Sequence, residues 1–372
     1  MDKNNGAIYD ARKLGKPKMI ILGVQHMFAM FGATILVPIL TGLDISTTLL
    51  MAGLGTLLFH CITKFKVPAF LGSSFAFLGG YAAIKAFSPN DPNSMLPYAC
   101  LGVACAGLIY FILAAVIKAV GIEKVMRFFP PVVTGPIIIA IGLGLAPSAV
   151  SNCTTNWFLA VVALAVIIVF NIWGKGMAKI IPIILGLLIS YGTGLVLYFI
   201  SQANPDLIQN VPWLFSGGAD ANGVYQPIFD FTSLNTICDN ISKGHIFGSE
   251  GLIGIPIHWD KTVFGGIDYS NGALIASSII AIVPIAFATM MEHIGDICAI
   301  SSTTGNNYIK DPGLHRTLVG DGLATTLASL FGGPANTTYG ENTGVLALTR
   351  VYDPRVIRIA AYFAVAVSFF PI

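Results

Sequence analysis

Two carboxylates and a histidine lie inside an apolar run that extends from about residue 274 to residue 300. Glu292 and Asp296 are four positions apart, so a helix projects both side chains from one face, roughly 6 Å apart along its axis. An ionisable group at membrane depth costs on the order of 2.5–3.5 kcal/mol, and such groups face a cavity or a partner. The pair therefore predicts a functional site within the membrane.

A third acid, Glu341, lies in a segment rich in small and polar residues, 336–344. Small residues allow the backbone to open there, and the start of a half-helix offers free N–H groups and a partial positive charge to the oxygens of a ligand. A glutamate beside those amides accepts the N–H groups of the same ligand. This combination suits a flat molecule whose edge alternates N–H and C=O groups.

Each of these acids also has a plainer interpretation, as a hydrogen-bond partner between helices. His293 follows Glu292 directly, so it points elsewhere on the helix, and we expect it to be packed and hydrogen-bonded. Asp321 is expected nearer the inner membrane interface. A metal needs three or four convergent ligands, and no second histidine cluster accompanies this segment, which argues against a metal site. The sequence has no Gly-Lys-Ser/Thr phosphate loop, so ATP-driven pumping has no support.

The composition places most of the chain in a membrane. Hydrophobic residues make up 55% of the sequence and charged residues 10%, against about 25% charged in a typical soluble domain. Mean hydropathy is +0.78, and apolar runs long enough to cross a ~30 Å hydrocarbon core recur along the chain. We expect an all-α polytopic membrane protein with spans near 19–40, 46–63, 97–117, 131–150, 156–173, 180–200, 272–300, 313–332 and 336–349, and a last run from about 357.

Two stretches of the chain predict interrupted spans. Residues 68–80 are too rich in Gly, Ser and Pro for a plain helix, and residues 334–339 echo them with Pro-Ala, two small hydroxyl residues and an aromatic. Each stretch lies third in its series of spans, and the two series run in opposite directions. Paired interruptions in inverted halves are the best sequence indication of a secondary transporter's binding site.

The basic residues predict the orientation in the membrane. Under this topology, all but three of the 20 Lys and Arg residues fall on the side of the N-terminal tail, the exceptions being Lys85, Lys243 and Lys261. Such an asymmetry predicts a multi-pass protein of the cell membrane with a cytoplasmic N-terminus. Residues 201–271 form a polar stretch without a crossing run, and we expect an extracytoplasmic insert with a little β structure.

Five motifs together resemble the nucleobase:cation symporter-2 family, the nucleobase-ascorbate transporters, and within it the uracil transporters of bacteria. The resemblance covers nearly the whole chain in the right order. The motifs are QHMFAMFGAT at 25–34, LGSSFAF at 71–77, EHIGD at 292–296, DPGLHR at 311–316 and NTTYGEN at 336–342.

The resemblance implies a fold of fourteen membrane segments in two inverted repeats of seven, with short strands in the interrupted spans three and ten. About eleven segments are expected in this sequence, which would be C-terminally truncated and lack spans twelve to fourteen. It also implies a cytoplasmic tail, a core domain in two parts and a gate domain, with an insert longer than the family's usual connection. These parts are 1–18 for the tail, 19–120 and 272–372 for the core, 121–200 for the gate and 201–271 for the insert.

The same resemblance implies proton-coupled uptake of uracil, by alternating access of the core domain against the gate domain and without any cofactor besides the proton. The residues it places around uracil are Glu292, Glu341, Phe75, Gly340, Ser74 and Tyr339. The two glutamates would bond the polar edge of the base, and the amides of Phe75 and Gly340 would meet its oxygens. Proton coupling would run through Glu292, Asp296 and Glu341. Asp296 stands where one type of family member carries histidine.

Other functions stay open at this point. A xanthine or other purine permease would use the same scaffold, although purine-selective relatives tend to carry an amide in place of Glu341. An intramembrane enzyme using Glu292, His293 and Asp296 would require a turnover product, and we expect a transporter rather than an enzyme. An anion transporter is disfavoured because the expected pocket contains acids and no Lys or Arg. The expected partners are uracil, the lipid bilayer and a second copy of the chain in a homodimer, but not nucleic acid.

Overall fold

The computed structural model describes residues 7–121, 149–175, 182–220, 222–232 and 253–370, with isolated positions between these ranges. The chain divides into two compact units. The first contains residues 1–138, 247–249 and 253–372, and the second contains residues 139–246 and 250–252. All of the predicted site residues lie in the first unit.

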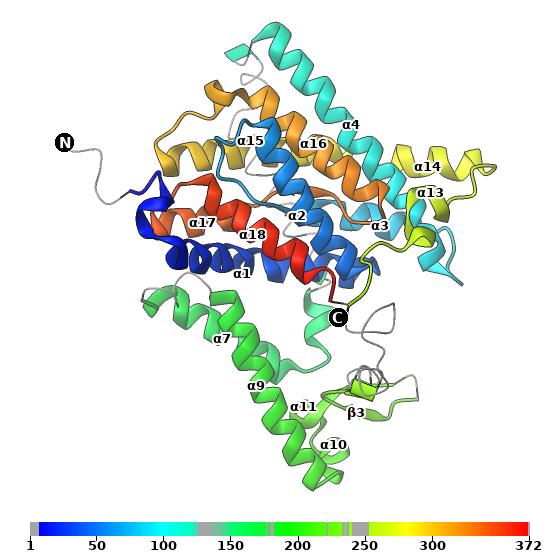
Figure 1. The fold of residues 1–372 in the computed structure, drawn as a ribbon. Coiled ribbons are helices and arrows are strands. Elements are labelled where there is room, and N and C mark those ends of the chain that lie inside the picture. The colour runs from blue at the N-terminus through cyan, green and yellow to red at the C-terminus, as the bar shows by residue number, and fades with distance from the viewer. Residues whose placement is uncertain are drawn as a thin grey trace. The chain divides into compact units, whose positions relative to one another are not determined.

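The first unit is built from helices (Figure 1) and contains two short strands. Its main elements are α1 (Lys16–Thr41), α2 (Ile45–Ile62), β1 (Leu71–Ser73), α3 (Leu78–Lys85), α4 (Leu96–Val120), α14 (Gly272–Ile282), α15 (Ile285–Thr304), α16 (Leu314–Leu330), β4 (Asn336–Thr338), α17 (Gly340–Thr349) and α18 (Pro354–Val367). Short helical turns connect them at η1 (Ala11–Leu14), η2 (Phe75–Phe77), η3 (Pro92–Met95), η4 (Trp259–Lys261), α13 (Val263–Gly266) and η5 (Ile309–Gly313).

Local sequence signals determine where the first helices begin and end. α1 has Pro17 in its first turn, where the fixed φ of proline fits and its missing N–H costs little. The helix ends before Gly42, whose φ of +83° favours glycine. α2 begins after Asp44, whose carboxylate accepts a hydrogen bond from the Thr47 amide at 2.7 Å. These signals explain why the first two predicted spans agree with α1 and α2 to within a few residues.

Small residues allow the helices of the first unit to pack closely. α16 packs against both α4 and α2, and α18 packs against α1 and α2. At the crossing of α4 and α16, a Cβ atom on Gly107 would lie 2.7 Å from the carbonyl oxygen of Gly322, so only glycine fits there. Close backbone approach of this kind is typical of membrane helices, which associate through packing rather than through the hydrophobic effect.

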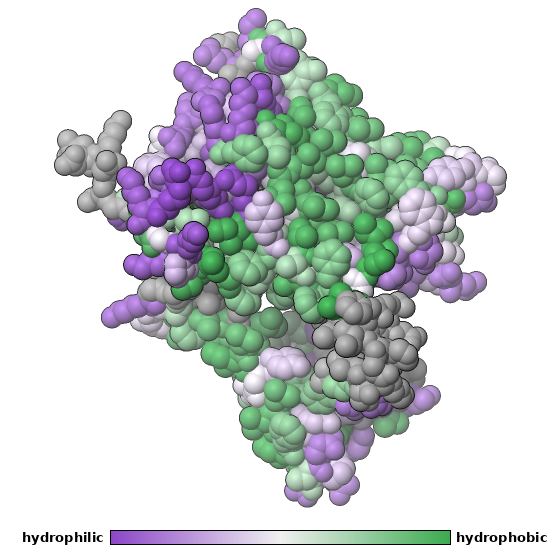
Figure 2. Space-filling model, viewed as in Figure 1, coloured by the Kyte–Doolittle hydropathy of each residue, from purple (hydrophilic) through white to green (hydrophobic). Residues whose placement is uncertain are grey.

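The prediction of a polytopic helical membrane protein is confirmed. Among the described residues, five helical stretches are long and apolar enough to cross a membrane: Lys16–Thr41, Ile45–Ile62, Pro92–Val120, Leu185–Ala203 and Gly272–Thr304. Figure 2 shows a broad hydrophobic band over the first unit, between hydrophilic residues near the start of α1 and others around α13 and α14. The strands expected in the two interrupted spans are also present, as β1 and β4.

The structure refines one of the predicted spans. The apolar run at 272–300 consists of α14 and α15, which meet at Val283 and Pro284. Proline has no N–H and its ring clashes with the preceding turn, so one helix ends there and the next begins. The span predicted at 131–150 lies largely outside the described residues.

The second unit pairs α7 (Trp157–Trp173) with α9 (Pro182–Ala203), close to two predicted spans. It continues through α10 (Asp206–Asn210) and α11 (Pro212–Phe215) into a hairpin of β2 (Ser216–Ala219) and β3 (Tyr225–Pro227), within the predicted insert. Phe229 and Phe231 follow the hairpin, stack at 5.7 Å and pack against Tyr198 of α9. The predicted domain boundaries at 120, 200 and 271 stay predictions.

Candidate functional site

A crossing of two short strands forms the centre of the candidate site. β1 and β4 pair antiparallel, with Gly72 opposite Thr337. The backbone pairing extends past both strand ends, because the Ser74 amide donates to Ala335 O at 2.9 Å and the Tyr339 amide donates to Phe70 O at 3.0 Å. Each strand is therefore held at a fixed register although it is only three residues long.

A helical turn begins directly after each strand. Phe75 is the first residue of η2, which leads into α3, and Gly340 is the first residue of α17. The first N–H groups of a helix have no partner within it and carry a partial positive charge. Because the strands are antiparallel, the two helix starts lie at opposite ends of the strand pair, and both η2 and α17 contact α15. The two backbone positions that were expected to meet ligand oxygens therefore flank the strand pair, each on an element that packs against the helix of Glu292 and Asp296.

Side chains from α2 and α16 fix the strands in matching ways. Thr56 Oγ1 of α2 accepts a hydrogen bond from the Leu71 amide at 2.9 Å, and Thr325 Oγ1 of α16 donates to Asn336 O at 2.9 Å. The Asn336 side chain also donates to Met51 O in α2 at 2.7 Å. The β1–β4 pair is therefore anchored to a helix of each half of the unit.

The three predicted acids converge near this crossing. Asp296 is in contact with β4 and α17, because its Oδ2 accepts a hydrogen bond from Thr338 Oγ1 at 3.1 Å and a Cβ on Gly340 would lie 3.3 Å from its Oδ1. Glu292 lies one turn earlier on α15, and Glu341 lies in the first turn of α17, which packs against α15. None of the described residues donates a hydrogen bond to the Glu292 or Glu341 carboxylate. These two acids are available to a ligand.

Tyr339 has a structural role that the sequence did not indicate. Its side chain is buried, and its hydroxyl donates to Ser73 O at 2.8 Å while accepting a hydrogen bond from Thr34 Oγ1 at 3.2 Å. Tyr339 therefore ties β4 to β1 and to α1. Ser74 is also buried and contributes its amide to the strand pairing. A lining role for Tyr339 and Ser74 stays a prediction.

A buried contact between a histidine and an aspartate behind β4 was not predicted from the sequence. His293 Nδ1 lies 3.4 Å from Asp321 Oδ2, and both side chains are fully buried. Asp321 Oδ1 accepts the Thr338 amide at 2.9 Å, and His293 Nδ1 lies 3.2 Å from Thr338 Oγ1. The expectation that His293 is packed and hydrogen-bonded is confirmed. The only sequence signal for Asp321 was a lone acid in an apolar run, which does not reveal its partner.

The His293–Asp321 pair connects to the site through one residue. Thr338 is bonded to Asp321 through its amide and to Asp296 through its hydroxyl. A carboxylate buried without compensation is costly, so Asp321 requires both the histidine and the amide. This requirement fixes the position of Thr338 and, through it, the Asp296 carboxylate.

Comparisons with known proteins identify the family of this chain. A family model described as "Permease family" (Xan_ur_permease) matches residues 17–372. A uracil permease of Bacillus caldolyticus is 39% identical over 361 residues, which are 94% of this chain and 71% of that protein. A probable uracil permease of Haemophilus influenzae is 37% identical over 96% of this chain and 75% of its own length. A putative pyrimidine permease of Escherichia coli is 34% identical over 99% of this chain and 73% of its own length.

The fold is also shared with a solved structure. The transmembrane domain of BicA, a cyanobacterial bicarbonate transporter, matches with a TM-score of 0.57 and 13% identity, over 98% of this chain and 86% of that one. At this low identity the match shows the transporter fold alone.

Proposed function

This chain belongs to the Permease family, the nucleobase:cation symporter-2 transporters, and on that premise we propose that it carries uracil together with protons across the cell membrane. Its relatives are named permeases, so the chain is a transporter and not an enzyme. The observation that carries the proposal is the arrangement of Glu292 and Glu341, which accept no hydrogen bond from the described residues, on helices that pack beside the two helix starts flanking the β1–β4 pair.

The edge of uracil matches this set of groups. Its two N–H groups require acceptors, which Glu292 and Glu341 supply from α15 and α17. Its two carbonyl oxygens require donors, which the backbone N–H groups at Phe75 and Gly340 supply. Hydrogen bonds that involve a charged group contribute about 1.5–3 kcal/mol, so the glutamates supply most of the discrimination. A purine presents a larger and differently ordered edge to the same groups.

Proton coupling follows from the same acids. Glu292, Asp296 and Glu341 lie close together at membrane depth, where charge is costly, so a proton shared among them favours occupation of the site. The Asp296 carboxylate already accepts a hydrogen bond from Thr338. Glu292 and Glu341 are therefore the two acids that we assign to the base. Transport by alternating access then moves the loaded site from one side of the membrane to the other, with the N-terminal tail in the cytoplasm.

Uptake of radiolabelled uracil into proteoliposomes tests the proposal. We expect uptake that is driven by an inward proton gradient, competed by excess unlabelled uracil and little affected by xanthine. Strong competition by xanthine would instead indicate a purine permease. Uptake that does not depend on the proton gradient would contradict proton coupling.

The Glu341→Gln variant tests the assigned contact. Glutamine keeps the size of the side chain but loses the charge, so uracil should bind at least about 10-fold more weakly, the equivalent of roughly 1.4 kcal/mol. Glu123→Gln, a change at an exposed glutamate after α4, is the matched control and should bind like the unchanged protein. Equal affinity in both variants would remove Glu341 from the site.

A further inference from the structure

The segment that precedes α1 is bound to the chain that follows α17. Ile8 pairs with Val351 in a parallel bridge, in which the Ile8 amide donates to Arg350 O and the Tyr352 amide donates to Ile8 O, both at 2.8 Å. Ala11 is fully buried beside Val351 and Val356. Residues 8–11 therefore form a fixed element, the N-terminal clasp, although they lie outside any predicted span.

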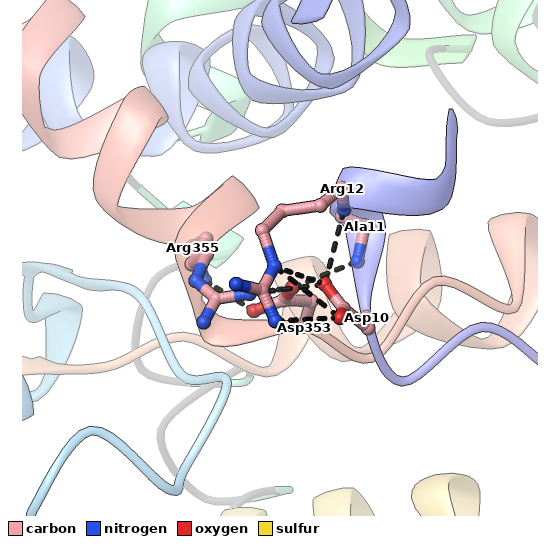
Figure 3. A network of polar contacts seen from close by, with 5 residues as sticks. All are labelled: Asp10, Ala11, Arg12, Asp353 and Arg355. Atoms are coloured by element: carbon pink, nitrogen blue, oxygen red, sulfur yellow. Dashed lines mark hydrogen bonds and ion pairs between the residues drawn. The ribbon is translucent and has the colours of Figure 1, made fainter. Parts of the chain in front are cut away.

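Charged side chains reinforce the N-terminal clasp (Figure 3). Asp353 Oδ2 accepts the Ala11 amide at 2.8 Å, and its Oδ1 caps the first turn of α18 by accepting the Arg355 amide at 2.9 Å. The Arg355 guanidinium also donates to Asp10 Oδ1 at 3.0 Å. Arg12 bonds only to Asp10 among these groups and joins no second element to the clasp.

Tyr9 connects the clasp to the other helix of the site. Its hydroxyl donates to the carbonyl oxygen of Thr304, the last residue of α15, at 2.7 Å. Its ring packs edge-on against Tyr352, with centroids 5.5 Å apart. The last carbonyls of a helix have no partner within it, so the tyrosine satisfies one of them. One residue thus contacts the end of α15 and the segment that follows α17.

The clasp lies at the C-terminal ends of α15 and α17, the two helices that carry the acids of the site. Asp296 is eight residues before the end of α15 and Glu341 is eight residues before the end of α17, about 12 Å along each axis. Near the acids, Asp296 of α15 is bonded to Thr338, two residues before α17 begins. Beyond the C-terminal ends, Tyr9 contacts Thr304 of α15 and Tyr352 after α17. Contacts at two separate points along a pair of helices determine the separation and the angle between them.

We propose that the N-terminal clasp is a positioning element, in which Tyr9 sets the spacing of α15 and α17 and thereby the spacing of the acids that receive the substrate. The inference rests on the proposed uracil site. It predicts that releasing the C-terminal ends of α15 and α17 weakens binding at the acids, even though no clasp residue touches the substrate.

Tyr9→Phe tests this directly, because it removes the hydroxyl bonded to Thr304 and keeps the ring packed on Tyr352. The loss of one hydrogen bond predicts a Kd for uracil about 2- to 10-fold higher, with KM raised and turnover little changed. Lys13→Ala is the matched control, since Lys13 is exposed on the same segment and its side chain has no hydrogen bond or ion pair with the described residues, and it should bind as the unchanged protein does. Tyr9→Ala should exceed the effect of Tyr9→Phe.

The readouts separate positioning from simple stabilisation. A fall in the amount of folded protein with unchanged Kd and KM would show that the clasp only stabilises the fold, and would overturn the proposal. Hydrogen exchange of the α17 amides is measured in parallel, and Tyr9→Phe should speed it while Lys13→Ala should not. If the unchanged protein binds no uracil, the proposed function fails, and the exchange result alone decides: faster exchange in Tyr9→Phe supports the clasp and equal exchange overturns it.

Discussion

The three acids of the site differ in what they already contact. Glu292 and Glu341 accept no hydrogen bond from the described residues, whereas the Asp296 carboxylate accepts one from Thr338 and lies against the start of α17. A group that is already bonded to the protein is better placed to exchange a proton than to accept a ligand. The structure therefore separates a pair that the sequence could describe only as two acids one turn apart.

Replacing Asp296 by asparagine should change the pH dependence of transport more than it changes binding. Asparagine still accepts the hydrogen bond from Thr338 but cannot exchange a proton. Uracil uptake by Asp296→Asn should therefore vary less with pH than uptake by the unchanged protein, while the Kd for uracil stays within about 3-fold, or less than 1 kcal/mol. An unchanged pH–rate profile would show that Asp296 is no proton relay.

Titration of the N-terminal clasp does not contribute to the pH dependence of uptake. The hydrogen bond from Arg12 holds the pKa of the Asp10 carboxyl well below its usual range. A carboxyl whose pKa is lowered by folding contributes stability above its unfolded pKa of about 4 and loses it only as pH falls through the folded value. The charge of Asp10 is therefore constant over the range in which uptake is measured.

The buried pair behind β4 makes a prediction about stability. Asp321→Ala leaves His293 and the Thr338 amide buried without their partner, and breaking a buried pair in this way costs about 3–5 kcal/mol. We expect a clearly lower unfolding temperature in detergent. Asp311→Ala is the matched control, because its ion pair with Lys66 is exposed and such pairs contribute about 0–1 kcal/mol. Equal unfolding temperatures in the two variants would contradict a structural role for Asp321.

At the scale of elements, hydropathy predicted the helices well and the strands poorly. A span such as α4 is specified by about 20 apolar residues with proline near its start, and each residue adds to the same signal. β1 and β4 contain three residues each and pair across most of the chain, so their register depends on contacts that no local pattern contains. The sequence could indicate two interruptions but not that Tyr339 would lie behind Gly72.

That contact gives a prediction at the level of the strand pair. A Cβ on Gly72 would lie 2.6 Å from the Tyr339 ring and 2.9 Å from Thr34 Oγ1, so alanine must displace the tyrosine and β4 with it. Gly72→Ala should weaken uracil binding by about 10-fold or more, as expected for overpacking that costs 1–3 kcal/mol. Gly79→Ala, in α3, is the control, because its Cβ would meet nothing within 4 Å. Unchanged uracil binding in Gly72→Ala would mean that the crossing is not part of the site.

At the scale of the whole molecule, the hydrophobic band and the distribution of charge give an orientation that native cysteines can test. Cys61, at the end of α2, and Cys238, in the predicted insert, are both exposed. The topology predicted from the basic residues places Cys61 on the cytoplasmic side and Cys238 outside. In intact cells a membrane-impermeant maleimide should label a variant that retains only Cys238, and should label one that retains only Cys61 after permeabilisation alone. The reverse pattern would invert the topology.

The pairing of β1 with β4 also has a consequence for synthesis. Ser73 and Tyr339 are bonded across 266 positions, so at about 5–20 residues per second the ribosome needs on the order of 10–50 s to deliver the partner strand. During that interval the backbone of β1 lies at membrane depth without its partner, and each unsatisfied polar group costs several kcal/mol in lipid. The hydroxyl of Thr56 covers only part of this edge. The nascent first half must therefore be sheltered, by the insertion machinery or by its own helices, until the second half arrives.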